Sequence, residues 1–155
     1  MKRPLRLIAM LLASLMLMTS FAFAVPSKET PSDGKQTGRY TEYTTYSNNT
    51  ATVTGTASST LQNKTKVISQ YAKLNGKKYL ITTLGKNAFA KMKKLKVVKI
   101  YSTKALKVQK NPFGKLNTKK ITIKVTKKMS AKEFKKFKKN LRKAGFKGKI
   151  VRVNI

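Results

Sequence analysis

The hydrophobic positions of this chain change their pattern three times along its length. Residues 1–6 are basic, residues 7–18 form an almost unbroken apolar run, and Ala22-Phe23-Ala24 follows as a small-x-small site. This order is typical of a secretory signal peptide, and the apolar run is too short to span a membrane. We therefore expect residues 1–24 to be a signal peptide, with an uncleaved N-terminal anchor as the alternative. The mature protein would begin at Val25 and be secreted.

Residues 25–49 have no apolar periodicity. Two prolines and two glycines lie among many Ser and Thr residues, which predicts a flexible Ser/Thr-rich linker. Tyr40, Tyr43 and Tyr46 recur at a spacing of three, and such rings could stack on a sugar or a nucleic-acid base. We favour the simpler interpretation that they lead into the first strand.

From Thr50 onward the pattern predicts strands. Residues 50–54 are rich in β-branched side chains, which favour extended structure. The pattern also predicts strands at residues 71–74 and 77–81, which flank Asn75-Gly76. Because both central residues of a tight hairpin turn need positive φ, Asn-Gly between two such runs predicts a β-hairpin.

An internal repeat follows the predicted hairpin. Residues 84–92 are echoed by residues 108–116 at an offset of 24, and both copies share an Asn-x-Phe centre. Downstream, residues 95–100 have the L-x-x-L-x-L spacing, and Ile121-x-Ile123 follows the second copy. A period of 20–29 residues with this spacing is typical of leucine-rich repeats, whose units bury their apolar faces by stacking.

The clearest helical pattern is near the C-terminus. Ser130 and Glu133 have the spacing of a capping box, in which each side chain bonds a backbone N–H at the helix start. Apolar residues then recur on one face, and Gly145 stands where a helix-ending residue of positive φ belongs. Residues 150–155 repeat the strand spacing. This helix and strand are expected to cover the open end of the stack.

The run of residues 79–89 continuing to residues 95–100 resembles the BspA-like (type 5) leucine-rich repeats of bacterial surface and secreted proteins. The ending from Ile121 to Ile155 is similar to the C-terminal unit of short Lys-rich secreted members. The resemblance implies a right-handed solenoid with a short parallel sheet, used in adhesion or extracellular binding. It supplies no catalytic residues.

The predicted fold class is therefore α+β. We expect residues 50–155 to form one short leucine-rich repeat solenoid with an N-terminal β-hairpin and a C-terminal capping helix plus strand. Its core should consist of Leu84, Phe89, Leu95, Val98, Ile100, Phe113, Ile121 and Ile123.

Composition restricts the chemistry that this chain can perform. It has 155 residues with 36 Lys and Arg, 4 Asp and Glu, no His and no Cys. Ser-His-Asp triads, thiol nucleophiles, disulfides and ordinary zinc sites are thereby excluded, and few carboxylates remain for Ca²⁺ or Mg²⁺. We therefore expect no enzymatic activity, no metal and no cofactor.

The charge is concentrated in one part of the chain. Residues 50–155 hold 30 basic residues and a single acid, Glu133, for a net charge of +29. Lys accounts for 31 of the 36 basic residues, and lysine acts as a hydrated point charge rather than as a planar fork that reads bases. Such a surface favours binding of polyanions without sequence preference, for example teichoic acid, anionic glycans or extracellular DNA.

The predicted polyanion contacts are exposed basic side chains of the strands and the helix. They are Lys96, Lys99, Lys119, Lys120, Lys124, Lys135, Lys139 and Arg142. We expect a monomer, possible partners being anionic polymers, nucleic acid, a membrane surface or a host or bacterial surface protein.

Three alternatives remain open. The lysines could simply keep the surface soluble. The solenoid face could support protein–protein adhesion, with charge supplying only solubility. The basic amphipathic helix of residues 131–144 could make the protein a membrane-active cationic effector.

Overall fold

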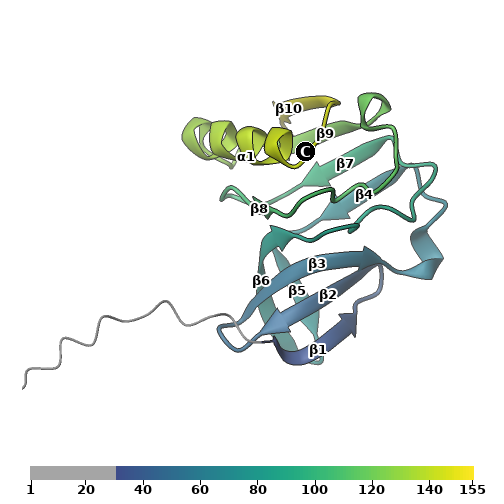
Figure 1. Ribbon diagram of the computed structural model, residues 1–155. Helices are drawn as coiled ribbons and strands as arrows, with labels where there is room; N and C mark the ends of the chain where they lie inside the picture. Colours follow the sequence, from purple (N-terminus) through teal and green to yellow (C-terminus); the bar gives the residue numbers. More distant parts are fainter. Residues whose placement is uncertain (1–30) are drawn as a thin grey trace, which may run out of the picture.

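A computed structural model describes residues 31–155, and its side chains from Gln36 onward (Figure 1). The predicted signal peptide and the start of the predicted linker lie outside the described residues. Over the described range the chain forms ten strands, one α-helix and two short 3₁₀ helices. None of the helices in this range is long and apolar enough to cross a membrane.

Sheet A contains six strands and is mixed. Its order is β1-β2-β3-β6-β5, and β8 also pairs with β6. The strands are β1 (Pro31–Thr37), β2 (Thr41–Tyr46), β3 (Thr50–Thr56), β5 (Tyr71–Leu74), β6 (Lys77–Leu84) and β8 (Lys107–Val108). The β1–β2, β2–β3 and β5–β6 pairs are antiparallel, whereas β3–β6 and β6–β8 are parallel.

The predicted hairpin is confirmed. β5 and β6 pair in antiparallel register from Leu74 and Lys77, and the turn residues Asn75 and Gly76 have φ of 48° and 76°. Two consecutive residues of positive φ give the turn the twist that matches a right-handed strand pair.

The prediction of a linker at residues 25–49 is wrong from residue 31 onward, because β1 and β2 lie in that part. The buried side chains of β2 are Thr41 and Thr45, whose exposed fractions are 4% and 0%. Threonine is β-branched and suits a strand, but it is not apolar and so leaves no hydrophobic alternation to read.

Sheet B contains four parallel strands in the order β10-β9-β7-β4. They are β4 (Thr65–Ile68), β7 (Val97–Ile100), β9 (Thr122–Thr126) and β10 (Lys149–Val153). Alternate residues of each strand turn inward, and Ile68, Ile100 and Val125 are almost fully buried. This period-two burial is the expected pattern for a sheet with one covered face.

The two copies of the internal repeat form matching turns that stack on each other. Asn87 and Asn111 have φ of 59° and 56°, a conformation that asparagine tolerates better than most residues. The Asn87 N–H donates to the Asn111 carbonyl at 3.1 Å, and the Phe89 N–H donates to the Pro112 carbonyl at 2.9 Å. The repeat in the sequence is therefore a repeat in structure.

Helix α1 (Ala131–Lys143) begins and ends where the sequence predicts. The Ser130 hydroxyl accepts the Glu133 N–H at 3.3 Å, and Gly145 has φ of 92° just beyond the helix. The second half of the predicted capping box is replaced by a longer-range contact. The Glu133 carboxylate accepts the Ala105 N–H at 2.7 Å and so fastens the helix to the segment before β8.

All eight residues predicted to form the core are buried, with exposed fractions of 6% or less. The inner side of α1 adds Phe137 and Leu141 to the same core.

The prediction of a leucine-rich repeat solenoid is wrong. The molecule is mostly β-structure with a mixed sheet, a parallel sheet and a single α-helix over residues 31–155, in an α+β arrangement (Figure 1). A repeat array would continue one unit along the chain, whereas the β1–β2, β2–β3 and β5–β6 pairs are antiparallel hairpins that do not follow the 24-residue period. Two repeat copies cannot impose their period on the remaining strands.

Candidate functional site

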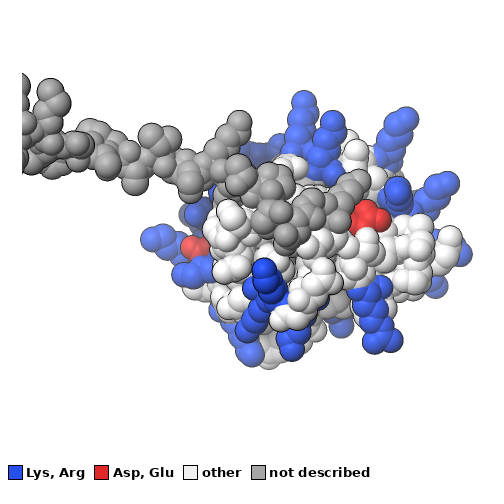
Figure 2. Space-filling view, turned by 90° about the horizontal axis from the view of Figure 1, so that it is seen from below, with Lys and Arg blue, Asp and Glu red and all other residues white. Residues whose placement is uncertain are grey.

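The basic side chains are almost all on the surface. Of the 30 basic residues between 50 and 155, only Lys66 is buried, and Lys99 and Lys124 are partly covered. Figure 2 shows basic side chains projecting at many places around the rim of one face. In the part of the chain whose side chains are described, the acids are Glu42 and Glu133. The protein therefore presents positive charge in most directions, and a site must be recognised by shape as well.

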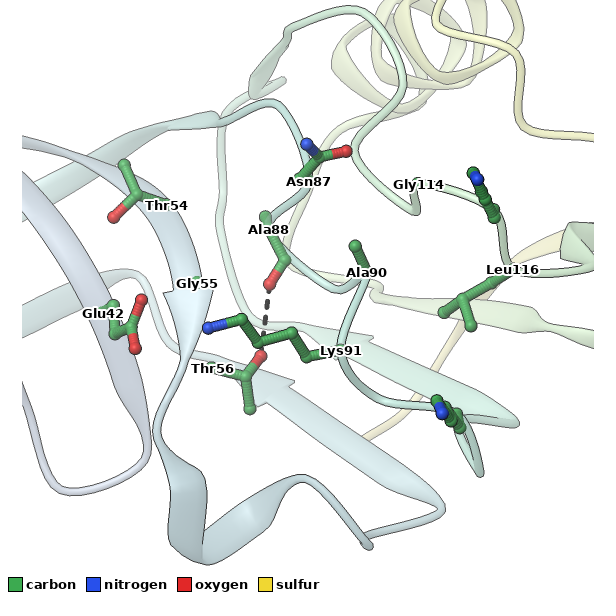
Figure 3. Close-up of a pocket in the computed structure, with 12 residues that line it drawn as sticks. Glu42, Thr54, Gly55, Thr56, Asn87, Ala88, Ala90, Lys91, Gly114 and Leu116 are labelled. Carbon is green, nitrogen blue, oxygen red and sulfur yellow. Dashed lines mark hydrogen bonds between the residues drawn. The ribbon is translucent and has the colours of Figure 1, made fainter.

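Two adjoining hollows concentrate this charge. A groove of about 710 Å³ lies between β3 and the two stacked repeat turns (Figure 3), and a smaller hollow of about 170 Å³ lies before β7 and β9. Lys93 and Leu116 line both hollows. We call their shared basic lining the lysine groove. It consists of Lys91, Lys93, Lys94, Lys96, Lys115 and Lys120.

The stacked turns bring the lysines of the groove together. Lys91 and Lys115 occupy the same position in the two repeat copies, each two residues after the repeat phenylalanine. Gly114 has φ of 57°, and a Cβ placed there would lie 2.6 Å from the Ala90 Cβ. Because Gly114 carries no side chain, the second turn can approach the first closely enough for both lysines to line one groove.

The opposite wall of the groove comes from sheet A. A Cβ at Gly55 would lie 2.1 Å from Oε2 of Glu42, so the glycine leaves the space that this carboxylate fills. The Thr56 hydroxyl donates to the Ala88 carbonyl at 3.2 Å and ties β3 to the first turn. Figure 3 shows the Lys91 side chain extending from the turn toward Gly55. The lining of the groove thus holds one acid, Glu42, against three lysines, and its other residues are neutral.

The structure divides the sequence-predicted contacts into three groups. Lys96 and Lys120 line the lysine groove, and the exposed Lys119 adjoins them on the 3₁₀ helix η2 (Thr118–Lys120). Lys99 and Lys124 pair in register across β7 and β9 on the outer face of sheet B.

The third group, Lys135, Lys139 and Arg142, is exposed on α1. The Arg142 Nη1 donates to the Phe146 carbonyl at 2.7 Å, so this side chain also closes the end of the helix.

Sequence reasoning missed four residues of the groove, namely Lys91, Lys93, Lys94 and Lys115. The signal for Lys91 and Lys115 was the shared place of lysine in the two repeat copies of this chain. Nothing local distinguishes Lys93 and Lys94 from the other lysines, because only the meeting of distant segments makes a groove.

Lys66 is the exception among the basic residues. It lies on β4, is 3% exposed, and its Nζ donates to the Tyr40 carbonyl. Burial lowers the pKa of Lys66 from 10.5 to about 8, and the nearby Glu42 opposes part of that shift. Lys66 therefore joins the two sheets internally and takes no part in the lysine groove.

No family model, curated protein or solved structure matches this chain. The resemblance to BspA-like repeats stays a prediction, and the function must be argued from the chain's own residues.

Proposed function

We propose that this protein is a non-catalytic binding module that holds anionic polymers in its lysine groove, outside the cell. The supporting observation is that six lysines, from segments 91–96 and 115–120, line two adjoining hollows with Glu42 as the one carboxylate in their lining. A row of ammonium groups neutralises successive phosphate, sulfate or carboxylate groups and releases their counterions. Teichoic acid, anionic glycans and extracellular DNA share this chemistry.

The membrane-active alternative receives less support from the structure. Phe137 and Leu141 on α1 are fully buried, and Phe134 is partly buried against the same core. The apolar stripe that would enter a lipid interface is thus occupied inside the folded protein.

Salt-gradient elution of matched variants from polyanion resins tests the proposal. The groove variant replaces Lys91, Lys93, Lys96 and Lys120 by Gln. The control variant replaces Lys127, Lys128, Lys138 and Lys143 by Gln, which removes the same charge from exposed positions outside the groove. Both are compared with the unaltered protein on heparin, DNA and teichoic-acid resins.

We expect the groove variant to elute at clearly lower salt than the control on at least one resin. On a nucleic-acid ligand, the slope of log K against log salt should also become shallower, by about 0.7–0.9 for each phosphate that the variant no longer neutralises. Equal elution of the two variants would show that total charge decides retention, and the groove would then have no special role.

A further inference from the structure

A second groove differs in character from the lysine groove. The exposed large hydrophobic side chains between Gln36 and Ile155 are Tyr40, Val67 and Tyr71, with exposed fractions of 49%, 48% and 41%. All three line one hollow of about 390 Å³, together with the partly buried Tyr43. Exposed apolar residues scattered singly need no explanation, but their convergence on one concave surface indicates a binding site.

Sheet A supplies the tyrosines of this hollow, and Val67 joins them from β4 of sheet B. Tyr40 precedes β2 and Tyr71 begins β5, two strands that are not neighbours in the sheet. A Cβ at Gly38 would lie 3.2 Å from Cε2 of Tyr43 and 3.3 Å from Cδ2 of Leu74, so the β1–β2 turn packs directly on β5. We call the resulting surface of Tyr40, Tyr43, Val67 and Tyr71 the tyrosine groove.

The backbone that carries the Tyr40 ring is fixed. The Tyr40 carbonyl accepts hydrogen bonds from the Thr60 hydroxyl at 3.3 Å, from the Ala57 N–H at 3.4 Å and from Lys66 Nζ. A ring that is exposed on an anchored backbone loses little conformational freedom when a ligand binds to it.

Each exposed tyrosine is paired with a cation. The Arg39 guanidinium lies 4.9 Å from the centre of the Tyr40 ring, and the Lys78 ammonium lies 4.1 Å from the centre of the Tyr71 ring. Lys73 adds a further charge to the lining. The groove therefore presents a repeated unit, a flat ring with a positive charge over one of its faces.

We propose that the tyrosine groove binds single-stranded nucleic acid by stacking bases on Tyr40 and Tyr71. A nucleotide chain repeats a flat base and a negative phosphate, which matches the repeated ring and cation of this surface. Aromatic platforms in a basic groove are the means by which proteins bind single strands without sequence preference. The site is separate from the lysine groove, and its test does not depend on the function proposed for that groove.

The test compares two labelled strands by fluorescence anisotropy. One is a thymidine oligonucleotide of about 10 nucleotides, within the usual range of site sizes. The other is an abasic strand of equal length, which has the same phosphate charge but nothing to stack. We expect the unaltered protein to bind the thymidine strand more tightly than the abasic strand at the same salt concentration.

Ring-removing variants locate the effect. Tyr40→Ala and Tyr71→Ala should each weaken binding of the thymidine strand by about 5- to 150-fold and leave binding of the abasic strand unchanged. Tyr40→Phe and Tyr71→Phe keep the ring and should retain binding. Because neither side chain is buried in the core, these variants should fold, which their melting temperatures will check.

The lysine-groove variant with four Lys→Gln changes is the matched comparison. It should change the affinity for the thymidine strand and for the abasic strand by the same factor. Equal affinity of the unaltered protein for the two strands would overturn the proposal. It would also be overturned if binding of an acidic polysaccharide required the tyrosine rings while binding of the thymidine strand did not, because the groove would then be a sugar platform.

Discussion

Phe89 and Phe113, which hold the same position in the two repeat copies, pack with ring centroids 5.0 Å apart and ring planes tilted by 35°. Phe146 continues the series at 5.0 Å from Phe113. All three rings are almost fully buried. This row of aromatic rings joins both repeat turns to the segment after α1, and it holds the turns that carry Lys91 and Lys115.

Phe113 lies in the middle of the row, so its removal should be costly. We expect Phe113→Ala to lower the free energy of unfolding by about 3–5 kcal/mol, the usual cost of a cavity left by a buried phenylalanine. Urea denaturation measures the change. Tyr40→Ala serves as a control of comparable size at the surface. A decrease below about 1 kcal/mol for Phe113→Ala would contradict the central place of this ring in the core.

Asn111 holds a left-handed conformation with φ of 56°. Asn111→Gly should be nearly neutral, because glycine adopts this conformation without strain, whereas Asn111→Val should cost about 1–2 kcal/mol. Thermal unfolding of both variants gives the comparison. The same substitutions at the exposed Asn63, which is not among the residues of positive φ, should not show this order, because strain is not at issue there.

Because Lys66 is buried, the free energy of unfolding should change with pH in the alkaline range. Its pKa is about 8 in the folded protein and near 10.5 in the unfolded chain, so the unfolded chain holds more protons between these values. Stability should therefore rise as the pH increases from about 8 to 10.5, whereas below pH 8 the full cost of burying the charged ammonium group is present. Denaturation of the unaltered protein and of Lys66→Met across this range measures the effect.

The difference in free energy of unfolding between the protein and Lys66→Met isolates this residue from the general neutralisation of lysines at high pH. A constant difference from pH 7 to 10.5 would mean that Lys66 titrates normally.

Glu133 should act in the acid range. Its hydrogen bond from the Ala105 N–H, aided by Lys136, Lys104 and Lys132, holds the pKa of this carboxyl below its ordinary value of 4.5. The ionised Glu133 carboxylate therefore stabilises the folded protein fully above pH 4.5. This contribution is lost as the pH falls through the lowered pKa and the carboxylate is protonated. Glu133→Gln should thus be less stable than the unaltered protein at pH 6. The difference in free energy of unfolding between the two proteins should decrease on acidification.

Anions should stabilise the folded protein. Like charges repel within the Debye length of about 8–10 Å, and a bound anion both screens them and binds only the folded groove. Sulfate or a polyphosphate should raise the melting temperature, with a smaller rise for the Lys91, Lys93, Lys96 and Lys120 variant. An equal rise in both proteins would assign the effect to general screening.

Local chemistry by itself determined several elements of this structure, independently of tertiary packing. Asn75-Gly76 predicted its hairpin because the turn demands positive φ, and Ser130 and Gly145 predicted the ends of α1 because they satisfy helix termini. The spacing of apolar residues predicted the eight core positions, since periodicity follows the geometry of strands and turns.

Tertiary structure alone decided the remaining features. Residues 31–37 and 41–46 form strands because sheet A gives them partners, although Thr41 and Thr45 supply no apolar alternation. The packing of the β1–β2 turn on β5 gathers Tyr40 with Tyr71, and the meeting of β4 of sheet B with the Tyr40 backbone buries Lys66.

The lysine groove likewise arises where distant segments meet. The sequence determined that the surface would be basic, because 30 of its last 106 residues carry positive charge. Which of those charges share a groove depended on the stacking of two turns 24 residues apart, a long-range arrangement that no local pattern encodes.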